Sequence, residues 1–130
     1  MTRPRPTAER REAEHLGRSA EAACIDSLQR GGWQVLATRF RPPRGQGAGE
    51  IDIVARRAAT LAFIEVKARA STVAAAESLG ARQQQRIARA AEVFLALNPD
   101  LAALDCRFDV MLVAADAPPA HLEDAWRPGW

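Results

Sequence analysis

The sequence contains few of the residues that bind transition metals or form disulfide bonds. Its two cysteines, Cys24 and Cys106, lie far apart and form no C-x-x-C unit. A single available pair in a chain without an export signal favours reduced, structural thiols. The two histidines, His15 and His121, are equally isolated. The sequence therefore offers almost no material for a zinc site.

A long apolar segment is also missing. The longest stretch without a charge or a proline is 31–38, far short of the roughly 20 apolar residues that span a membrane. The basic N-terminus is followed by no apolar stretch, so we expect no secretory signal and a soluble, cytoplasmic protein. The 130 residues fit one domain, and 28 of them are alanine. We therefore expect a small core flanked by alanine-rich helices.

Lysine is nearly absent, because 17 of the 18 basic residues are arginine and only Lys67 is lysine. A compositional bias explains the arginines, which makes the position of the single lysine informative. The formal net charge of +2 is too small to indicate a nucleic-acid partner by itself. A basic surface would have to come from local clustering.

The order of the predicted elements, α-β-β-β-α-β, indicates a single α/β domain with a central mixed sheet flanked by helices. We assign residues 1–13 to a flexible basic tail and residues 14–130 to this domain. After Asp116, the proline-containing C-terminal segment is expected to form a short covering helix. The predicted elements are a helix from Thr7 or Ala8 to Gln29, strands over 33–41, 50–56 and 61–69, a helix over 80–97 and a strand over 106–114.

The helix over 80–97 carries an apolar stripe at spacings of three and four residues, which is typical of a helix packed against a sheet. The stripe consists of Ile87, Ala90, Ala91, Phe94 and Leu97.

Two acidic residues and the single lysine are expected to meet on one face of a β-hairpin. If the turn is centred on Ala58-Ala59, Asp52 lies directly opposite Glu65, and a register shift of two residues keeps both on one face. Lys67 shares that face because side chains alternate along a strand. Opposed carboxylates repel each other unless a cation lies between them. The alternative is an ordinary amphipathic strand with a Glu–Lys pair, because E-x-K triplets are common.

This arrangement suits a hard metal ion, Mg²⁺ or Mn²⁺, with Asp52 and Glu65 as the candidate ligands. Such an ion activates water and stabilises the charge that develops on phosphate. The neighbouring ammonium of Lys67 would orient that water or neutralise the transition state. Lysine is a compact point charge, whereas the planar group of arginine would fit differently.

Glu21 is a further candidate, on the first helix. At about 100° per residue it falls on the apolar arc of that helix, between Leu28 and Ile25. A carboxylate on a core-facing arc is costly unless a cation meets it. The alternative is a glutamate at the helix edge that reaches water or pairs with an arginine.

Four arginines close in sequence to these acids are candidates for contacts with a phosphate backbone. For each of them, simple solvation is the alternative. The four are Arg39, Arg41, Arg44 and Arg69.

Three other polar residues have roles that the sequence leaves open. Glu50 is either an auxiliary ligand or a loop cap. Gln83 either touches a phosphate or water, or lies on a solvated helix face. Asp109 is expected to be a structural partner for an arginine.

Four ordered motifs resemble the YraN-like family, which is similar to Holliday-junction resolvases within the PD-(D/E)xK nuclease superfamily. The resemblance implies a restriction-endonuclease-like core with Asp52, Glu65 and Lys67 at the catalytic positions and Glu21 as the first-helix acid. The hairpin turn departs from the family pattern, because it has alanines where relatives more often carry Asp and Gly. The motifs are G-x-x-x-E at Gly17–Glu21, G-E-I-D at Gly49–Asp52, F-I-E-V-K-A-R at Phe63–Arg69 and R-F-D-V at Arg107–Val110.

The leading hypothesis is a metal-dependent endonuclease-like hydrolase that acts on nucleic acid, with DNA, branched or single-stranded, as the first candidate. A non-catalytic module that binds nucleic acid or a partner protein is the alternative, and a purely structural domain is the third. No membrane partner is expected. Enzymes that cut junctions need two-fold symmetry, but the sequence identifies no homodimer interface.

Overall fold

A computed structural model describes residues 8–45, 47–68, 80–115 and 117–128. Its elements follow the predicted order, with one additional strand at the end. They are α1 (Ala8–Arg30), β1 (Gln34–Phe40), β2 (Ile51–Arg57), β3 (Thr60–Ala68), α3 (Ala81–Leu97), the 3-10 turn η1 (Pro99–Leu101), β4 (Asp105–Val113) and β5 (Ala120–Trp126).

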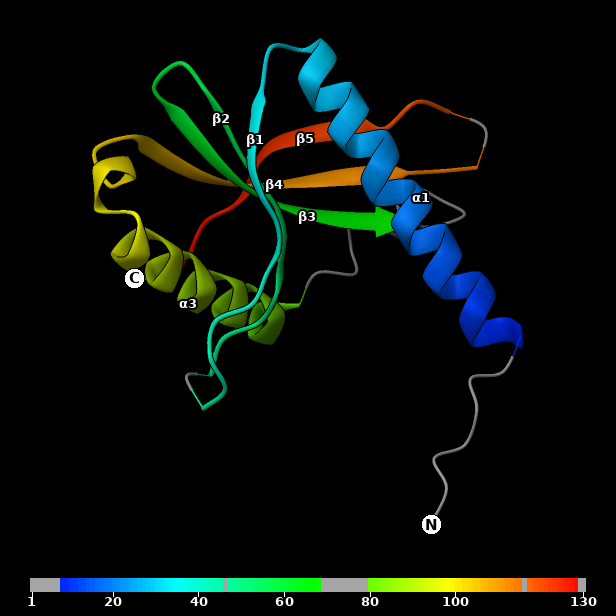
Figure 1. The fold of residues 1–130 in the computed structure, drawn as a ribbon, viewed down its shortest axis with the longest axis horizontal. Helices are drawn as coiled ribbons and strands as arrows, with labels where there is room; N and C mark the ends of the chain where they lie inside the picture. The colour runs from blue at the N-terminus through cyan, green and yellow to red at the C-terminus, as the bar shows by residue number, and fades with distance from the viewer. Residues whose placement is uncertain (1–7, 46, 69–79, 116, 129–130) are drawn as a thin grey trace.

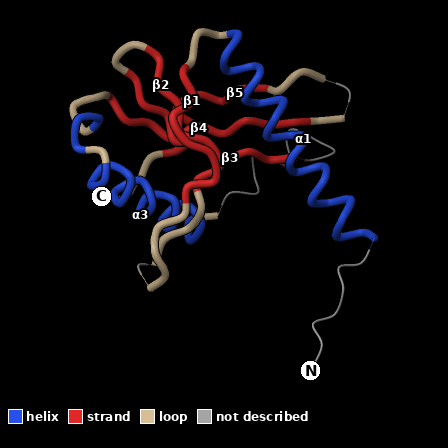
Figure 2. The backbone as a smooth tube through the Cα atoms, in the orientation of Figure 1, coloured by secondary structure: helices blue, strands red, loops and turns tan. Residues whose placement is uncertain are grey.

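The strands form one mixed sheet in the order β1-β2-β3-β4-β5 (Figure 1). The pairs β1–β2, β2–β3 and β4–β5 are antiparallel, whereas β3 and β4 are parallel. A parallel pair needs a crossover connection, and α3 lies on it. Figure 2 shows that α1 and α3 flank the strands. The predicted α/β domain with a mixed sheet flanked by helices is confirmed.

Each face of the sheet carries its own core. Neighbouring residues of β3 point to opposite faces, so that Phe63 packs with Phe94 of α3 while Ile64 packs with Cys24 of α1. The two helices therefore cover opposite faces, and side chains from both can approach the ends of the strands between them.

The hairpin of β2 and β3 has the register that the sequence predicted. Ile53 pairs with Ile64, and the turn lies between Arg57 and Thr60. Ala58 has φ +52°, the left-handed conformation that costs a residue with a Cβ atom roughly 1–2 kcal/mol. The departure from Asp and Gly in this turn thus adds local strain but leaves the register unchanged.

The apolar stripe of α3 is buried except at its last position. Its first four members are buried as predicted, but Leu97 is 65% exposed, so its assignment to the core is wrong. Leu97 is the last residue of the helix, and Leu101 of η1 enters the core after it. Because the chain bends after α3, Leu101 occupies the core in place of Leu97.

The predicted C-terminal covering helix is also wrong, because this segment forms β5. β5 pairs with β4 through Val110↔Leu122, Met111↔His121 and Leu112↔Ala120. An unpaired edge would leave a row of backbone donors and acceptors exposed, and β5 satisfies them on one side of β4. This long-range pairing decides the conformation of a segment with no clear apolar alternation.

The first helix begins at Ala8. Residues 8–13, which the predicted tail included, are therefore helical, and residues 1–7 lie outside the described residues. Within the described part of the chain, neither α1 nor α3 has both the length and the apolar character needed to cross a lipid bilayer.

Candidate functional site

The central feature of the site is a fork between β2 and β3. Pairing of β1 with β2 extends to Phe40↔Ile51, whereas pairing of β2 with β3 ends at Ile53↔Ile64. Beyond that pair, the backbone N–H of Val66 donates to Oδ2 of Asp52 at 2.8 Å. A side-chain carboxylate thus satisfies a strand amide where the ladder ends, which holds Asp52 at the opening of the fork.

Glu65 and Lys67 lie beside Asp52 on the β3 side of the fork. The carboxyl group of Asp52 is one of the causes that raise the pKa of Glu65, so the two groups lie close together. Nζ of Lys67 is 3.7 Å from Oε1 of Glu65, and the two side chains are only 11% and 12% exposed. The structure therefore brings together the three residues that the sequence predicted to share a face.

Burial is the main reason why both carboxyl groups hold protons strongly. Burial, with the charge of Asp52 as the next cause, raises the pKa of Glu65 to about 8, although Lys67 opposes the shift. Burial also raises the pKa of Asp52, against the hydrogen bond from Val66. Two acids in a poorly solvated site cannot both ionise without a compensating cation. The pair therefore shares a proton at neutral pH, unless a metal cation takes the place of that proton.

The oxygens of this pair fit a Mg²⁺ or Mn²⁺ ion. These hard ions accept one or two carboxylates and keep several water or phosphate ligands. In the described part of the chain, no group of three or more His, Cys, Asp or Glu residues is arranged to enclose a metal. Asp52 and Glu65 would thus form an open site, in which most of the coordination positions remain for water and substrate.

Gln83 also reaches the site, from the first turn of α3. Its Nε2 donates to Oε1 of Glu65 at 3.1 Å, and this is the oxygen that faces Lys67. The sequence left open whether Gln83 touches a ligand or lies on a solvated face. Its contact with Glu65 places it among the site residues, since it orients one of the two carboxyl groups.

Glu21 lies at the edge of the site and is paired with an arginine. Its Oε2 accepts a hydrogen bond from Nε of Arg39 at 3.0 Å, and its side chain is 16% exposed. Its charge contributes to the raised pKa of Asp52. The pairing matches the simpler of the two interpretations of this glutamate.

The predicted phosphate-binding arginines have different surroundings. Arg39 has φ +51° and is held by Glu21. Arg41 forms an ion pair with Glu50, from Nη2 to Oε2 at 2.8 Å. Arg44 is exposed on the loop between β1 and β2. Arg69 lies outside the described residues, so the structure places only the other three.

Glu50, the acid immediately before β2, forms its ion pair with Arg41 and not with a residue of the Asp52–Glu65 pair. Nε of Arg41 donates to the same Oε2 of Glu50 at 2.9 Å. The charge of Glu50 nevertheless contributes to the raised pKa of Asp52. Glu50 is therefore an electrostatic neighbour of the site.

A second buried carboxylate, Asp109, lies on the α1 face of the sheet. It is fully buried and accepts hydrogen bonds from Arg107, His121 and the N–H of Asp124. Burial alone would raise the pKa of Asp109, but these hydrogen bonds and the charge of Arg107 lower it. A structural pairing of Asp109 with an arginine was predicted. The contact with His121, which looked isolated in the sequence, was not, because it depends on β5.

The two cysteines are free thiols. Cys24 is buried, and burial together with the charges of Asp52 and Glu21 raises its pKa to about 12. A thiol that stays protonated is a poor nucleophile and a poor metal ligand. Cys24 therefore serves as a core residue behind the site.

Comparison with known proteins gives relatives that cover most of the chain. The family described as "Uncharacterised protein family UPF0102" matches residues 20–113 of this chain, a range that includes the fork and α3. A UPF0102 protein of Paramagnetospirillum magneticum is 46% identical over 122 residues, 94% of this chain and 95% of the relative. One of Parvibaculum lavamentivorans is 48% identical over 116 residues, 89% and 84% of the two chains. One of Rhodopseudomonas palustris is 49% identical over 121 residues, 93% and 89%.

Proposed function

This chain belongs to the UPF0102 (YraN) family, as its motifs predicted, and we propose that it is a metal-dependent nuclease that hydrolyses phosphodiester bonds in DNA. The observation that carries the proposal is the pair of carboxyl groups of Asp52 and Glu65 at the fork, with the ammonium of Lys67 3.7 Å from Glu65. Neither the pairing of like charges nor the burial of a lysine is favourable for stability alone. Both are useful where a cation and a phosphate must be bound together.

Asp52 and Glu65 are the residues that would hold Mg²⁺ or Mn²⁺, which when bound supplies a Lewis acid that activates water and stabilises charge on phosphate. Asp52 is fixed for this role by Val66, and Glu65 by Gln83. Each carboxyl group thus has a second contact that limits its rotation. This preorganisation is what a catalytic carboxylate requires.

Lys67 contributes a positive charge that is confined near the reacting phosphate. Its largely buried side chain leaves the ammonium little freedom to move away from Glu65. Placed there, it orients the attacking water or neutralises the charge that develops on the phosphate oxygens. Glu21 acts indirectly, because its carboxylate holds the guanidinium of Arg39 at the edge of the site.

The substrate side of the proposal rests on arginines around the fork. Arg39, Arg41 and Arg44 offer guanidinium groups on the β1–β2 side, where a phosphate backbone entering the site would pass. A nucleic-acid substrate also fits a cytoplasmic location. A non-catalytic binding module would use the same arginines, so that turnover is the property that separates the two functions.

The proposal predicts metal-dependent cleavage that requires Asp52. Purified protein would be incubated with single-stranded, duplex and junction DNA, in Mg²⁺, in Mn²⁺ and in EDTA. Asp52→Asn should lower the rate at least about 100-fold, because it removes one charge from the metal-binding pair. The matched control is Asp26→Asn, which makes the same change in an exposed carboxylate that pairs with Arg30 on α1.

Two results would count against the proposal in different ways. Binding of these DNAs without cleavage in either metal would favour the non-catalytic module. Equal cleavage by Asp52→Asn and Asp26→Asn would mean that the reaction takes place elsewhere on the protein or in a contaminant.

A further inference from the structure

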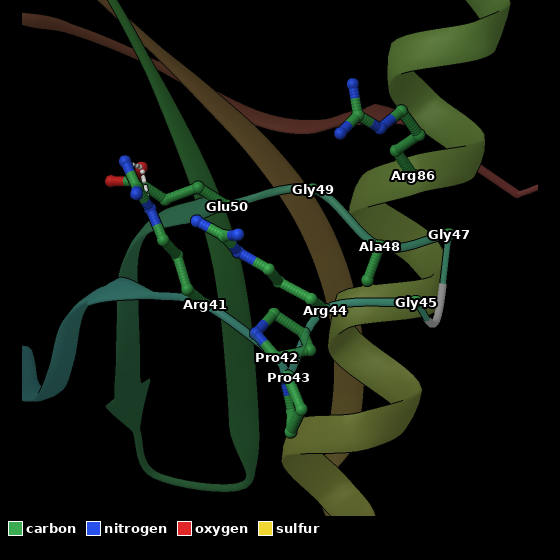
Figure 3. A pocket seen from close by; sticks show the side chains of 10 residues that line it. All are labelled: Arg41, Pro42, Pro43, Arg44, Gly45, Gly47, Ala48, Gly49, Glu50 and Arg86. Carbon is green, nitrogen blue, oxygen red and sulfur yellow. Dashed lines mark hydrogen bonds and ion pairs between the residues drawn. The ribbon is translucent and has the colours of Figure 1, made fainter.

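A cavity of about 350 Å³ lies between the β1–β2 loop and α3. We call it the arginine pocket, because Arg41, Arg44 and Arg86 line it together with Glu50 and Gly49. Figure 3 shows Gly47, Ala48 and Gly49 beside α3, with Arg86 on the helix and Arg41 joined to Glu50 by a dashed line. Two segments far apart in sequence thus contribute arginines to one hollow.

The charge of the arginine pocket is positive and only partly compensated. Arg41 is neutralised by Glu50, with Nη2 and Oε2 2.8 Å apart. Within the described residues, no ion pair engages Arg44 or Arg86. Three guanidinium groups and one carboxylate leave an excess of two positive charges. Such an excess is suited to an anion, and guanidinium groups bind phosphate oxygens through paired N–H donors.

The backbone gives this pocket a defined shape. The N–H of Gly49 donates to the carbonyl oxygen of Arg86 at 2.9 Å. A Cβ atom at position 49 would lie 3.3 Å from Cβ of Arg86, tighter than ordinary contact. Glycine therefore allows the loop to lie directly on α3. The pocket is built by this contact, and does not depend on the chance proximity of three long side chains.

The pocket is connected to the Asp52–Glu65 pair through two segments, the chain that enters β2 and the first turns of α3. Glu50 precedes Asp52 by two residues and lies immediately before β2. Arg86 follows Gln83 by three residues on α3, so both lie on the same side of the helix. Because Gln83 contacts Glu65, Arg86 lies about one helical turn from a residue that reaches the Asp52–Glu65 pair.

We propose that the arginine pocket binds one phosphate group of the nucleic-acid strand that is cut at the Asp52–Glu65 pair. The inference rests on the proposed nuclease function and adds to it a subsite that sets the position of the strand. The phosphate can come from an internal diester or from a phosphorylated strand end, and both present the oxygens that Arg44 and Arg86 recognise.

The test measures binding separately from cleavage. Arg44→Ala and Arg86→Ala would each be made in an Asp52→Asn background, and binding of a labelled single-stranded 12-mer would be followed across a range of salt concentrations. Each change should weaken binding about tenfold at low salt, as loss of a charged hydrogen bond does. The salt dependence should also decrease by about 0.7 in slope per lost contact.

The control is Arg30→Ala in the same background, which removes one positive charge from the last residue of α1. Figure 1 shows this end of the helix far from α3 and from the loop between β1 and β2. It should change affinity less than about twofold, because an exposed distant charge is screened. The proposed phosphate site would be contradicted if Arg44→Ala and Arg86→Ala bound the strand as tightly as this control. It would also be contradicted if the Asp52→Asn protein bound no strand at all.

Two further arms identify the phosphate and separate the two proposals. Tighter binding of a 5′- or 3′-phosphorylated 12-mer than of the hydroxyl-ended strand would place a terminal phosphate in the pocket, and equal binding would place an internal diester there. If the native protein cleaves DNA but the arginine variants bind as the control does, only the pocket is wrong. If the arginine variants lose binding in a protein that cleaves nothing, the pocket stands and the nuclease function fails.

Discussion

Lys67→Arg is expected to lower the rate of DNA cleavage on the order of 100-fold, without loss of fold or metal binding. Arginine keeps the charge but replaces a compact ammonium with a longer, planar group. At position 67 the side chain is 11% exposed and its Nζ lies 3.7 Å from Glu65, so a wider group cannot occupy the same place. Single-turnover cleavage at saturating metal would measure the chemical step.

Arg30→Lys is the matched control for that variant, because it exchanges the same two residue types at an exposed position of α1. It should cleave at the native rate. Near-native cleavage by Lys67→Arg would exclude Lys67 from the chemical step. A loss of Mn²⁺ binding in Lys67→Arg would instead mean that the wider guanidinium group displaces the carboxyl groups that hold the metal.

The second large effect concerns stability and pH in the absence of metal. The pKa of Glu65 is about 8 in the folded protein and near 4.5 in an unfolded chain. Between these values the folded state holds more protons than the unfolded state, so the free energy of unfolding falls as pH rises. The raised pKa of Asp52 acts in the same direction. Since one pKa unit corresponds to about 1.4 kcal/mol, we expect a loss of a few kcal/mol between pH 4.5 and 8.

Urea unfolding in EDTA across that pH range would measure this effect. Glu65→Gln should remove most of the dependence, because glutamine does not titrate, and Asp26→Asn should leave it intact. The lowered pKa of Asp109 acts in the opposite direction, but only as pH falls below 3.8. A native profile that is flat or rises between pH 4.5 and 8 would contradict the proton-sharing pair.

The hairpin and its polar residues could be predicted because they depend on local rules. A two-residue turn at Ala58-Ala59 fixes the register, and the register determines which side chains share a face. Asp52, Glu65 and Lys67 follow from that parity alone. The end of the ladder at Ile53↔Ile64 does not, because it depends on how β1 and β2 diverge from β3.

Contacts that depend on packing between distant segments could not be predicted from the sequence. Gln83 reaches Glu65 only because the tertiary fold brings the first turn of α3 beside that carboxyl group of β3. His121 contacts Asp109 only because β5 pairs with β4. In both cases the local pattern was compatible with a solvated residue, and the tertiary arrangement decided the contact.

The most direct test of the central claim, that Asp52 and Glu65 form a metal site, is a calorimetric titration with Mn²⁺. Native protein and the Asp26→Asn control should bind with the same affinity, whereas Asp52→Asn and Glu65→Gln should each bind at least about 100-fold more weakly, because each loses one of the two charged ligands. Undiminished Mn²⁺ binding by both Asp52→Asn and Glu65→Gln would contradict the account.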